Sequence, residues 1–243
     1  MHIKMIVCDL DGTLLRADGS ISGYTLKVLE RCRKMSIKIT VATARNKFMS
    51  EKIVNIINPD AVITNGGAFA GIGNEIVYSC CLDQADANNI VKKLLKRGHI
   101  TRISAEGKNF YLENLLTEFS GSLPHGVHKI NARIGGESLG DFCKDMPDVH
   151  MLKYRDEDLV RFAHKNAGKM YAVQAVADYM GINIKEIVAF GDDLIDIEML
   201  KDCGIGVAVA NAVDEVKAAA DCICGSNDED GVAKWLDSCL GRL

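Results

Sequence analysis

A chain of 243 residues with a formal net charge of -4 can bury a substantial core, and its acidic balance argues against a nucleic-acid backbone as partner. Hydrophobic residues make up 48% and charged residues 26%, values that exclude disordered and fibrous proteins. The nine cysteines include no C-x-x-C pair and are interpreted as reduced side chains. Because we find no signal-peptide core and no membrane-length apolar run, we expect a cytoplasmic protein without a membrane partner.

Strand-like and helix-like segments alternate in the first part of the chain. Ser22 is placed to cap a helix, and Pro59 ends the second helical pattern before the turn Asn65-Gly66-Gly67. Strands are predicted at 3–8, 37–43 and 61–64, and helices at 22–35 and 49–57. This β-α-β-α-β order predicts a parallel sheet covered by helices.

The same alternation returns in the last part of the chain. A helix at 170–180 is closed by Gly181, and a final helix contains Val232, Trp235 and Leu236. Strands are predicted at 187–190, 205–209 and 222–224, with short helices after the first two. We therefore predict an α/β fold, in which residues 1–81 and 160–243 form one doubly wound, Rossmann-like core.

The intervening residues 82–159 follow a different pattern. They offer a polar helix, a possible hairpin in the stretch TRIS…NFYLENL, and a Gly-rich passage at Gly135 and Gly136. This composition predicts a smaller inserted α+β domain rather than a flexible tether. His125 and His128 are interpreted as loop histidines and not as a metal-binding pair, because Pro124 and Gly126 flank the first of them.

Polar side chains follow four of the predicted core strands. Asp9, Thr43, Asn65 and Asp192 each lie at or just beyond a strand's carboxyl end, where open parallel sheets build their ligand crevices. We therefore expect them to converge on one edge of the sheet.

Carboxylates are concentrated at two of these positions. Asp9 and Asp11 are one residue apart, and Asp192 and Asp196 are four apart, which a helical turn would bring to one side. So many like charges require a divalent cation, and oxygen ligands without histidine or thiol favour Mg²⁺. The alternative is that Asp192 or Asp193 only caps the following helix.

A phosphate group is the expected companion of this metal. Thr43 offers a hydroxyl, and Lys169 stands in the first turn of a predicted helix, where the helix dipole disfavours a cation unless an anion is also bound. A solvated surface lysine is the alternative for Lys169.

The ordered motifs resemble those of the haloacid dehalogenase superfamily of phosphohydrolases, and within it the Cof-type branch with a type IIB cap. The resemblance covers nearly the whole core, with departures at Ala44, where Gly is common, and at Ile195, where Asn is common. It rests on DLDGT at 9–13, VATAR at 41–45, NGG at 65–67, the Lys169 segment, GDDLIDIEML at 191–200 and the tail that begins GVAVANAV at 206.

The resemblance implies a role for each matching residue. Asp9 would be the nucleophile that forms an aspartyl-phosphate, and Asp11 the general acid and base. Mg²⁺ would be held by Asp9, the main-chain carbonyl of Asp11 and Asp192, with Asp196 nearby. The residues expected to bind the phosphoryl group are Gly12, Thr43, Asn65, Gly66 and Lys169, and the inserted domain would act as a lid.

The resulting expectation is a Mg²⁺-dependent phosphatase for a small phosphorylated metabolite such as a sugar phosphate. Two alternatives stay open: a phosphomutase, which uses the same aspartyl-phosphate, and a signalling receiver, which holds phosphate on an aspartate as a signal. A dinucleotide oxidoreductase is disfavoured because Val209 stands where its fingerprint requires the third glycine.

Overall fold

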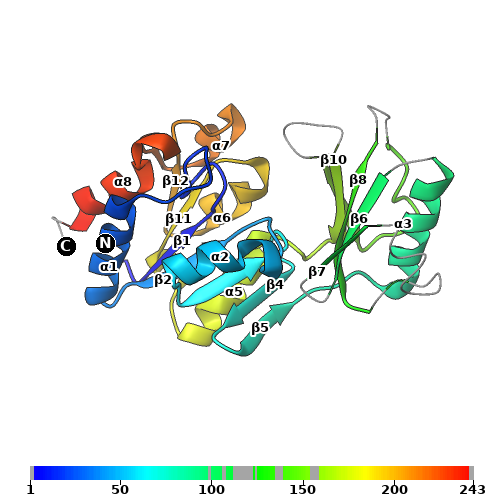
Figure 1. The fold of residues 1–243 in the computed structure, drawn as a ribbon, viewed down its shortest axis with the longest axis horizontal. Helices are drawn as coiled ribbons and strands as arrows, with labels where there is room; N and C mark the ends of the chain where they lie inside the picture. Colours follow the sequence, from blue (N-terminus) through cyan, green and yellow to red (C-terminus); the bar gives the residue numbers. More distant parts are fainter. Residues whose placement is uncertain are drawn as a thin grey trace.

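The computed structural model of the protein describes residues 3–97, 100–105, 108–111, 123, 125–134, 139–153 and 159–240. Their strands form two sheets, one of eight strands in the order β13-β12-β11-β1-β2-β3-β4-β5 and one of five in the order β7-β6-β8-β10-β9. Figure 1 shows the two sheets at opposite ends of an elongated molecule.

The centre of the larger sheet is doubly wound and parallel, as predicted. β1 pairs with β11 on one side and with β2 on the other, so the chain order reverses between β1 and β11. The apolar strands are buried because helices cover both faces. The parallel strands are β1 (Met5–Cys8), β2 (Lys38–Ala42), β3 (Ala61–Thr64), β11 (Ile187–Gly191), β12 (Ile205–Ala208) and β13 (Cys222–Ile223).

The predicted core helices are confirmed. Ser22 caps α1 by accepting a hydrogen bond from the Thr25 N–H, and α5 ends at Gly181 with a φ of 66°. α1 packs against α8, whereas α5 packs against α6, as right-handed crossovers on both sides of the reversal require. The helices are α1 (Gly23–Lys34), α2 (Lys47–Ile57), α5 (Lys169–Met180), α6 (Ile197–Asp202), α7 (Asp214–Ala219) and α8 (Gly231–Leu240), with 3₁₀ turns η1 (Ile184–Glu186), η2 (Leu194–Asp196) and η3 (Asn227–Glu229).

A hairpin that the sequence analysis did not predict extends the larger sheet. β4 (Phe69–Ile72) and β5 (Glu75–Ser79) add two antiparallel strands beyond β3. The turn at Asn65, Gly66 and Gly67, all with positive φ, reverses the chain directly after β3 and makes this pairing possible.

The smaller sheet is antiparallel and packs against α3 (Gln84–Lys96), the α+β arrangement expected for the inserted segment. The predicted hairpin is confirmed over β6 and β7, whereas 112–122 and the Gly135–Gly136 passage lie outside the described residues. The elements are α3 (Gln84–Lys96), β6 (Ile100–Ala105), β7 (Lys108–Tyr111), β8 (Val127–Arg133), β9 (Val149–Lys153) and β10 (Leu159–His164).

Two details differ from the sequence expectation for this segment. β10 continues to His164, so the pairing of the smaller sheet extends past the expected boundary at residue 159; the domain division itself stays a prediction. His128 is not a loop residue, because it lies within β8, is 6% exposed and contacts the Phe69 ring edge-on.

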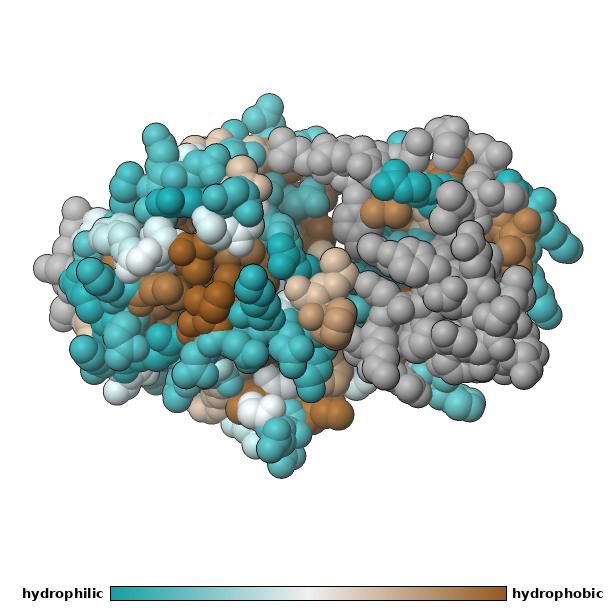
Figure 2. All heavy atoms as spheres, in the orientation of Figure 1, coloured by the Kyte–Doolittle hydropathy of each residue, from teal (hydrophilic) through white to brown (hydrophobic). Residues whose placement is uncertain are grey.

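Each sheet has its own hydrophobic core, and the two cores are separate clusters of buried side chains. The largest exposed apolar side chains of α2 are Phe48, Met49 and Ile56, and Figure 2 shows hydrophobic side chains gathered over this part of the larger sheet's surface. Among the helices of the described residues, none has the length and apolarity to cross a membrane.

Two glycines of the core touch close to the place where the chain returns from the smaller sheet. Gly67 has a φ of +97°, and a Cβ there would lie 2.2 Å from the main-chain carbon and oxygen of Gly168, directly before α5. Arg161 of β10 reinforces this junction, since its Nη2 donates to the Ala167 carbonyl at 2.6 Å and to the Asn65 carbonyl at 3.1 Å. The loop after β3 therefore fixes the start of α5.

We predict that Gly67→Ala is far more destabilising than Gly73→Ala, although both glycines have positive φ. Gly73 has nothing within 4 Å of the added carbon, so its substitution should cost only the conformational penalty of about 1–2 kcal/mol. Gly67→Ala adds a clash with backbone that we expect to cost about 1–3 kcal/mol more. Equilibrium urea unfolding measures both, and equal losses would contradict the contact.

Candidate active site

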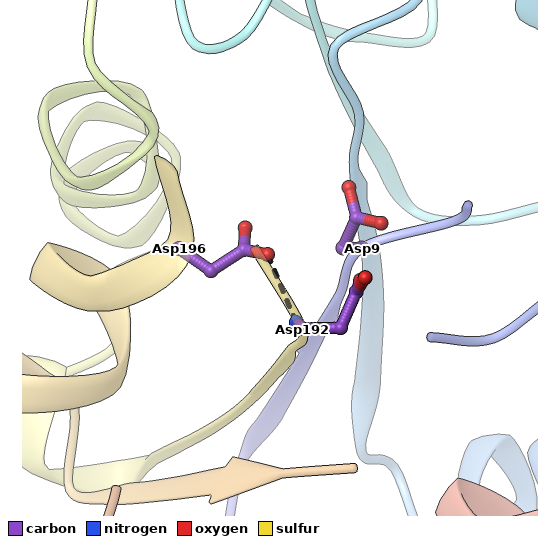
Figure 3. Close-up of side chains that lie close together, drawn as sticks. All are labelled: Asp9, Asp192 and Asp196. Carbon is purple, nitrogen blue, oxygen red and sulfur yellow. Dashed lines mark hydrogen bonds between the residues drawn. The ribbon is translucent and has the colours of Figure 1, made fainter. Parts of the chain in front are cut away.

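The site begins where the chain order of the sheet reverses. Asp9 follows β1 and Asp192 follows β11, and these neighbouring parallel strands are in register, with Cys8 opposite Phe190. The Asp9 N–H donates to the Phe190 carbonyl at 3.0 Å, which fixes the strand end. Figure 3 shows the two carboxylates side by side.

A third carboxylate comes from the turn that follows β11. Asp196 ends η2, and its Oδ2 accepts hydrogen bonds from the main-chain N–H groups of Asp192 at 3.1 Å and Asp193 at 3.2 Å. One carboxylate oxygen each from Asp9, Asp192 and Asp196 lies within 4.8 Å of the others, and all three residues are buried. The structure thus brings together three predicted metal ligands.

The capping role considered for this segment belongs to Asp193. Its Oδ1 accepts the Leu194 N–H at 2.8 Å at the start of η2. The Asp192 Oδ1 instead accepts the Thr13 hydroxyl at 2.6 Å and so is held beside Asp9. The two adjacent aspartates therefore have different environments.

Lys169 is the cation of this cluster and not a surface lysine. It is the first residue of α5, its side chain is 1% exposed, and its Nζ lies 2.5 Å from Asp9 Oδ1 and 2.6 Å from Asp196 Oδ1. Although burial opposes its charge, the Asp196 and Asp9 carboxylates raise the pKa of Lys169, so the amine stays protonated.

The charges of the cluster do not balance. Three carboxylates and one ammonium leave an excess of two negative charges in a buried place. Burial raises the pKa of Asp9 well above its usual range, and the Asp196 and Asp192 carboxylates raise it further. Burial also raises the pKa of Asp192 to about 6. The set of oxygen donors and the charge excess fit a divalent cation.

Asp11, in contrast, does not join the three buried carboxylates. Its side chain is 54% exposed and forms a two-pronged ion pair with Arg45, from Nε to Oδ2 at 2.8 Å and from Nη2 to Oδ1 at 2.5 Å. The carboxylate lies outside the buried cluster, and Arg45 holds it beside the loop that follows β2.

The remaining predicted residues line the loops at the same edge. The buried Thr43 hydroxyl accepts the Arg45 N–H at 3.1 Å, and the Thr43 carbonyl accepts the Gly66 N–H at 2.9 Å. The Asn65 Oδ1 accepts the Ser104 hydroxyl of β6 at 2.9 Å.

Gly12 lies close to Asp192. It has a φ of +78°, and a Cβ there would lie 2.5 Å from the Asp192 Oδ2. Only glycine therefore lets this turn approach the carboxylates so closely.

Several residues of this region were not predicted from the sequence. Thr13 and Arg45 stand within the DLDGT and VATAR motifs, which could have drawn attention to them. Asn211 donates from Nδ2 to the Gly12 carbonyl at 2.7 Å, and it stands in the GVAVANAV tail. The side chains of the smaller sheet that reach the core loops, Ser104, Lys129 and Arg161, stand in none of these motifs.

The chain is similar to known proteins over nearly its whole length. A sequence model of the haloacid dehalogenase-like hydrolases matches residues 6–138 and 127–236. The chain is 26% identical to the 5-amino-6-(5-phospho-D-ribitylamino)uracil phosphatase YcsE of Bacillus subtilis, over 97% of this chain and 95% of that protein.

Solved structures share the fold. A sugar phosphatase of subclass IIB of the superfamily, BT4131, superposes with a TM-score of 0.83 at 24% identity and covers 99% of this chain and 100% of its own. The phosphatase BT1666 of Bacteroides thetaiotaomicron gives a TM-score of 0.85 at 21% identity, over 98% of this chain and 95% of that chain.

The raised pKa of Asp192 predicts how stability depends on pH without metal. The folded state binds this proton more tightly than the unfolded state, so the stability it contributes is present below the ordinary pKa of 3.8 and is lost as pH rises through about 6. In EDTA, Asp192→Asn should therefore stabilise the protein by about 2–3 kcal/mol at pH 8 and have little effect near pH 4.

The fully exposed Asp214 provides the matched control, since Asp214→Asn should change stability by less than about 1 kcal/mol at either pH. Urea unfolding of both variants at the two pH values measures the effect. If Asp192→Asn were less stable than the parent protein at pH 8, burial of the ionised Asp192 carboxylate would not be destabilising.

Proposed function

The chain belongs to the haloacid dehalogenase-like hydrolases and is a phosphatase of that family, and from this we propose that it is a Mg²⁺-dependent enzyme that hydrolyses a small phosphorylated, hydroxyl-bearing metabolite such as a sugar phosphate. The observation that carries the proposal is the buried cluster of Asp9, Asp192, Asp196 and Lys169 at the carboxyl ends of β1 and β11. Such a cluster has a nucleophile, oxygen ligands and a cation in one place.

Asp9, Asp192 and the Asp11 main-chain carbonyl would hold Mg²⁺, with Asp196 beside them. The fit rests on the donor set, which is all oxygen, and on the two uncompensated negative charges of the buried cluster. When bound, the ion would neutralise phosphoryl oxygens that otherwise repel the attacking carboxylate.

Asp9 would act as the nucleophile. Its free carboxylate oxygen attacks phosphorus, the bond between phosphorus and the ester oxygen breaks, and an aspartyl-phosphate forms. Water then attacks the same phosphorus, the bond to Asp9 breaks, and inorganic phosphate leaves. Lys169 orients the carboxylate by holding its Oδ1, which leaves the other oxygen for attack.

Asp11 would move the protons. It gives one to the departing ester oxygen and later takes one from the attacking water, so that it is regenerated in each cycle. In the structure its carboxylate is engaged by Arg45, so Asp11 must exchange that contact for the substrate oxygen. Its exposure leaves it room to do so.

The phosphoryl oxygens would be bound by the Thr43 hydroxyl, the Lys169 ammonium and the backbone at Gly12, Asn65 and Gly66. Support comes from their shared position at the edge of the sheet and from the close approach of Gly12 to Asp192. Preorganised donors of this kind stabilise charge as it redistributes during phosphoryl transfer.

The smaller sheet would act as the lid over this site. Three of its side chains already contact core loops: Ser104, Lys129 and Arg161. We propose the division into a core of 1–81 and 160–243 and a lid of 82–159, although β10 carries the pairing of the lid sheet on to His164. The relative named above acts on a ribityl phosphate, which supports a polyhydroxylated substrate, and a cytoplasmic location stays a prediction.

Removal of metal should abolish phosphatase activity. EDTA should reduce phosphate release to background, and added Mg²⁺ should restore it, whereas Ca²⁺ should restore little because its looser coordination displaces the attacking oxygen. Phosphate release from a panel of sugar phosphates measures this, and full activity in metal-free buffer would defeat the assignment. Formation of an isomerised sugar phosphate without free phosphate would indicate a phosphomutase instead.

Substitution of each aspartate of the DLDGT motif should affect a different step of the reaction. Asp9→Asn should form no aspartyl-phosphate and show background turnover, because the nucleophile is gone. Asp11→Asn keeps its main-chain carbonyl but cannot transfer a proton, an effect typically worth about 10²- to 10⁴-fold. In Asp11→Asn, the rate of aspartyl-phosphate formation should fall less with an aryl phosphate than with a sugar phosphate, because the leaving oxygen of an aryl phosphate needs little protonation.

Rapid-quench measurement of the phosphoenzyme with both esters tests this division. Asp178→Asn is a control of the same chemical type, since Asp178 lies on α5 and its carboxylate accepts a hydrogen bond from Gln174 at the exposed surface. Equal losses with the two esters in Asp11→Asn, or a phosphoenzyme in Asp9→Asn, would refute the proposed roles.

A further inference from the structure

One face of the lid sheet carries a row of polar side chains. Asn131 of β8 pairs directly with Arg161 of β10, and Lys129 of β8 pairs directly with Ser104 of β6. Residues two apart on a strand, and residues directly opposite on neighbouring strands, point to the same face of a sheet. The four side chains therefore share one face.

This face is turned toward the catalytic edge of the core. The Ser104 hydroxyl donates to the Asn65 Oδ1 at 2.9 Å, the Lys129 ammonium donates to the Ala44 carbonyl, and the Arg161 guanidinium donates to the Asn65 carbonyl at 3.1 Å. Ala44 and Asn65 stand in the loops that follow β2 and β3. Asn131 lies between these contacts.

The side-chain oxygen of Asn131 has no hydrogen-bond partner among the described residues. Its side chain is 3% exposed, and its Oδ1 accepts no hydrogen bond from any residue that the structure describes. A buried amide oxygen without a donor typically costs about 1–3 kcal/mol. This unpaired oxygen lies on the face turned toward the catalytic site. Its position there indicates a ligand that supplies the missing donor.

The surroundings restrict what that donor is. An acceptor oxygen repels anionic groups, and the neighbouring cations Lys129 and Arg161 disfavour an ammonium group. A neutral hydroxyl satisfies both conditions, and its own oxygen can in turn accept from the Asn131 amide nitrogen. The phosphate itself belongs to the core loops, so the hydroxyl comes from the alcohol part of the substrate.

We propose that Asn131 is a specificity-determining residue that binds a hydroxyl of the leaving group and so selects phosphate esters of polyhydroxylated alcohols over those of plain alkyl alcohols. The inference rests on the proposed phosphatase function, because it assumes that the ester binds between this face and the core. A site built to hydrogen-bond a hydroxyl discriminates strongly against the analogue that lacks it, since the amide is then left unpaired.

The test compares two esters of equal chain length, hexitol 6-phosphate and n-hexyl phosphate. Asn131→Leu should lower kcat/KM for the hexitol ester about 10- to 100-fold and change that for the hexyl ester less than about 3-fold. Asn89→Leu is the matched control, because Asn89 lies on α3 and donates to Asp145 at the exposed surface, its one side-chain hydrogen bond among the described residues. It should change neither value.

A stability measurement separates this role from a structural one. Because Asn131→Leu removes an unpaired buried amide, the melting temperature of the ligand-free protein should stay the same or rise. A fall in melting temperature together with equal losses on both esters would overturn the proposal, since it would show that Asn131 only supports the fold.

A binding measurement tests the role of Asn131 independently of the proposed phosphatase activity. Calorimetry of hexitol 6-phosphate with Asp9→Asn should give a dissociation constant about 10- to 100-fold lower than with the Asp9→Asn, Asn131→Leu double variant. Equal affinities overturn the role of Asn131. Absence of phosphate release by the unaltered enzyme would overturn the proposed function instead.

Discussion

The contact of the Lys169 ammonium with the Asp9 and Asp196 carboxylates is the interaction on which the site depends. Without it, three carboxylates would share a buried sheet edge with no cation from the protein, an arrangement that burial makes very unfavourable. Lys169 also begins α5, the first helix after β10 of the smaller sheet, and Gly168 before it packs against Gly67. The position of the lid's last strand and the electrostatics of the core are therefore coupled through a few residues of backbone.

Charge is distributed unequally between the two parts of the molecule. The core edge keeps two negative charges that its own lysine does not balance, whereas the facing side of the lid sheet presents Lys129 and Arg161 to the core loops. A dianionic phosphate bound between them, with a divalent cation on the core side, would meet positive charge from both directions. Neither part would offer this environment alone.

The sequence predicted those parts of the molecule that depend on local pattern. Strand-end positions identified Asp9, Asp192 and Thr43, because neighbouring parallel strands bring their carboxyl ends together whichever side chains they carry. The four-residue spacing from Asp192 identified Asp196. The β4–β5 hairpin, the Asp11–Arg45 ion pair and the buried place of His128 were not predictable in this way. Each depends on which distant segment packs alongside, and alternation or spacing within one segment carries no information about that.

The buried carboxylates of the core and the Asn131 amide of the smaller sheet differ in what compensates them. In the core the buried carboxylates are held by Lys169, by the Thr13 hydroxyl and by main-chain N–H groups, so each has some compensation inside the protein. In the lid the Asn131 oxygen has none among the described residues. Groups that act on every substrate can be compensated within the fold, whereas a group that distinguishes one alcohol from another must stay unsatisfied until that alcohol arrives. A more stable lid at this position would therefore be a less selective one.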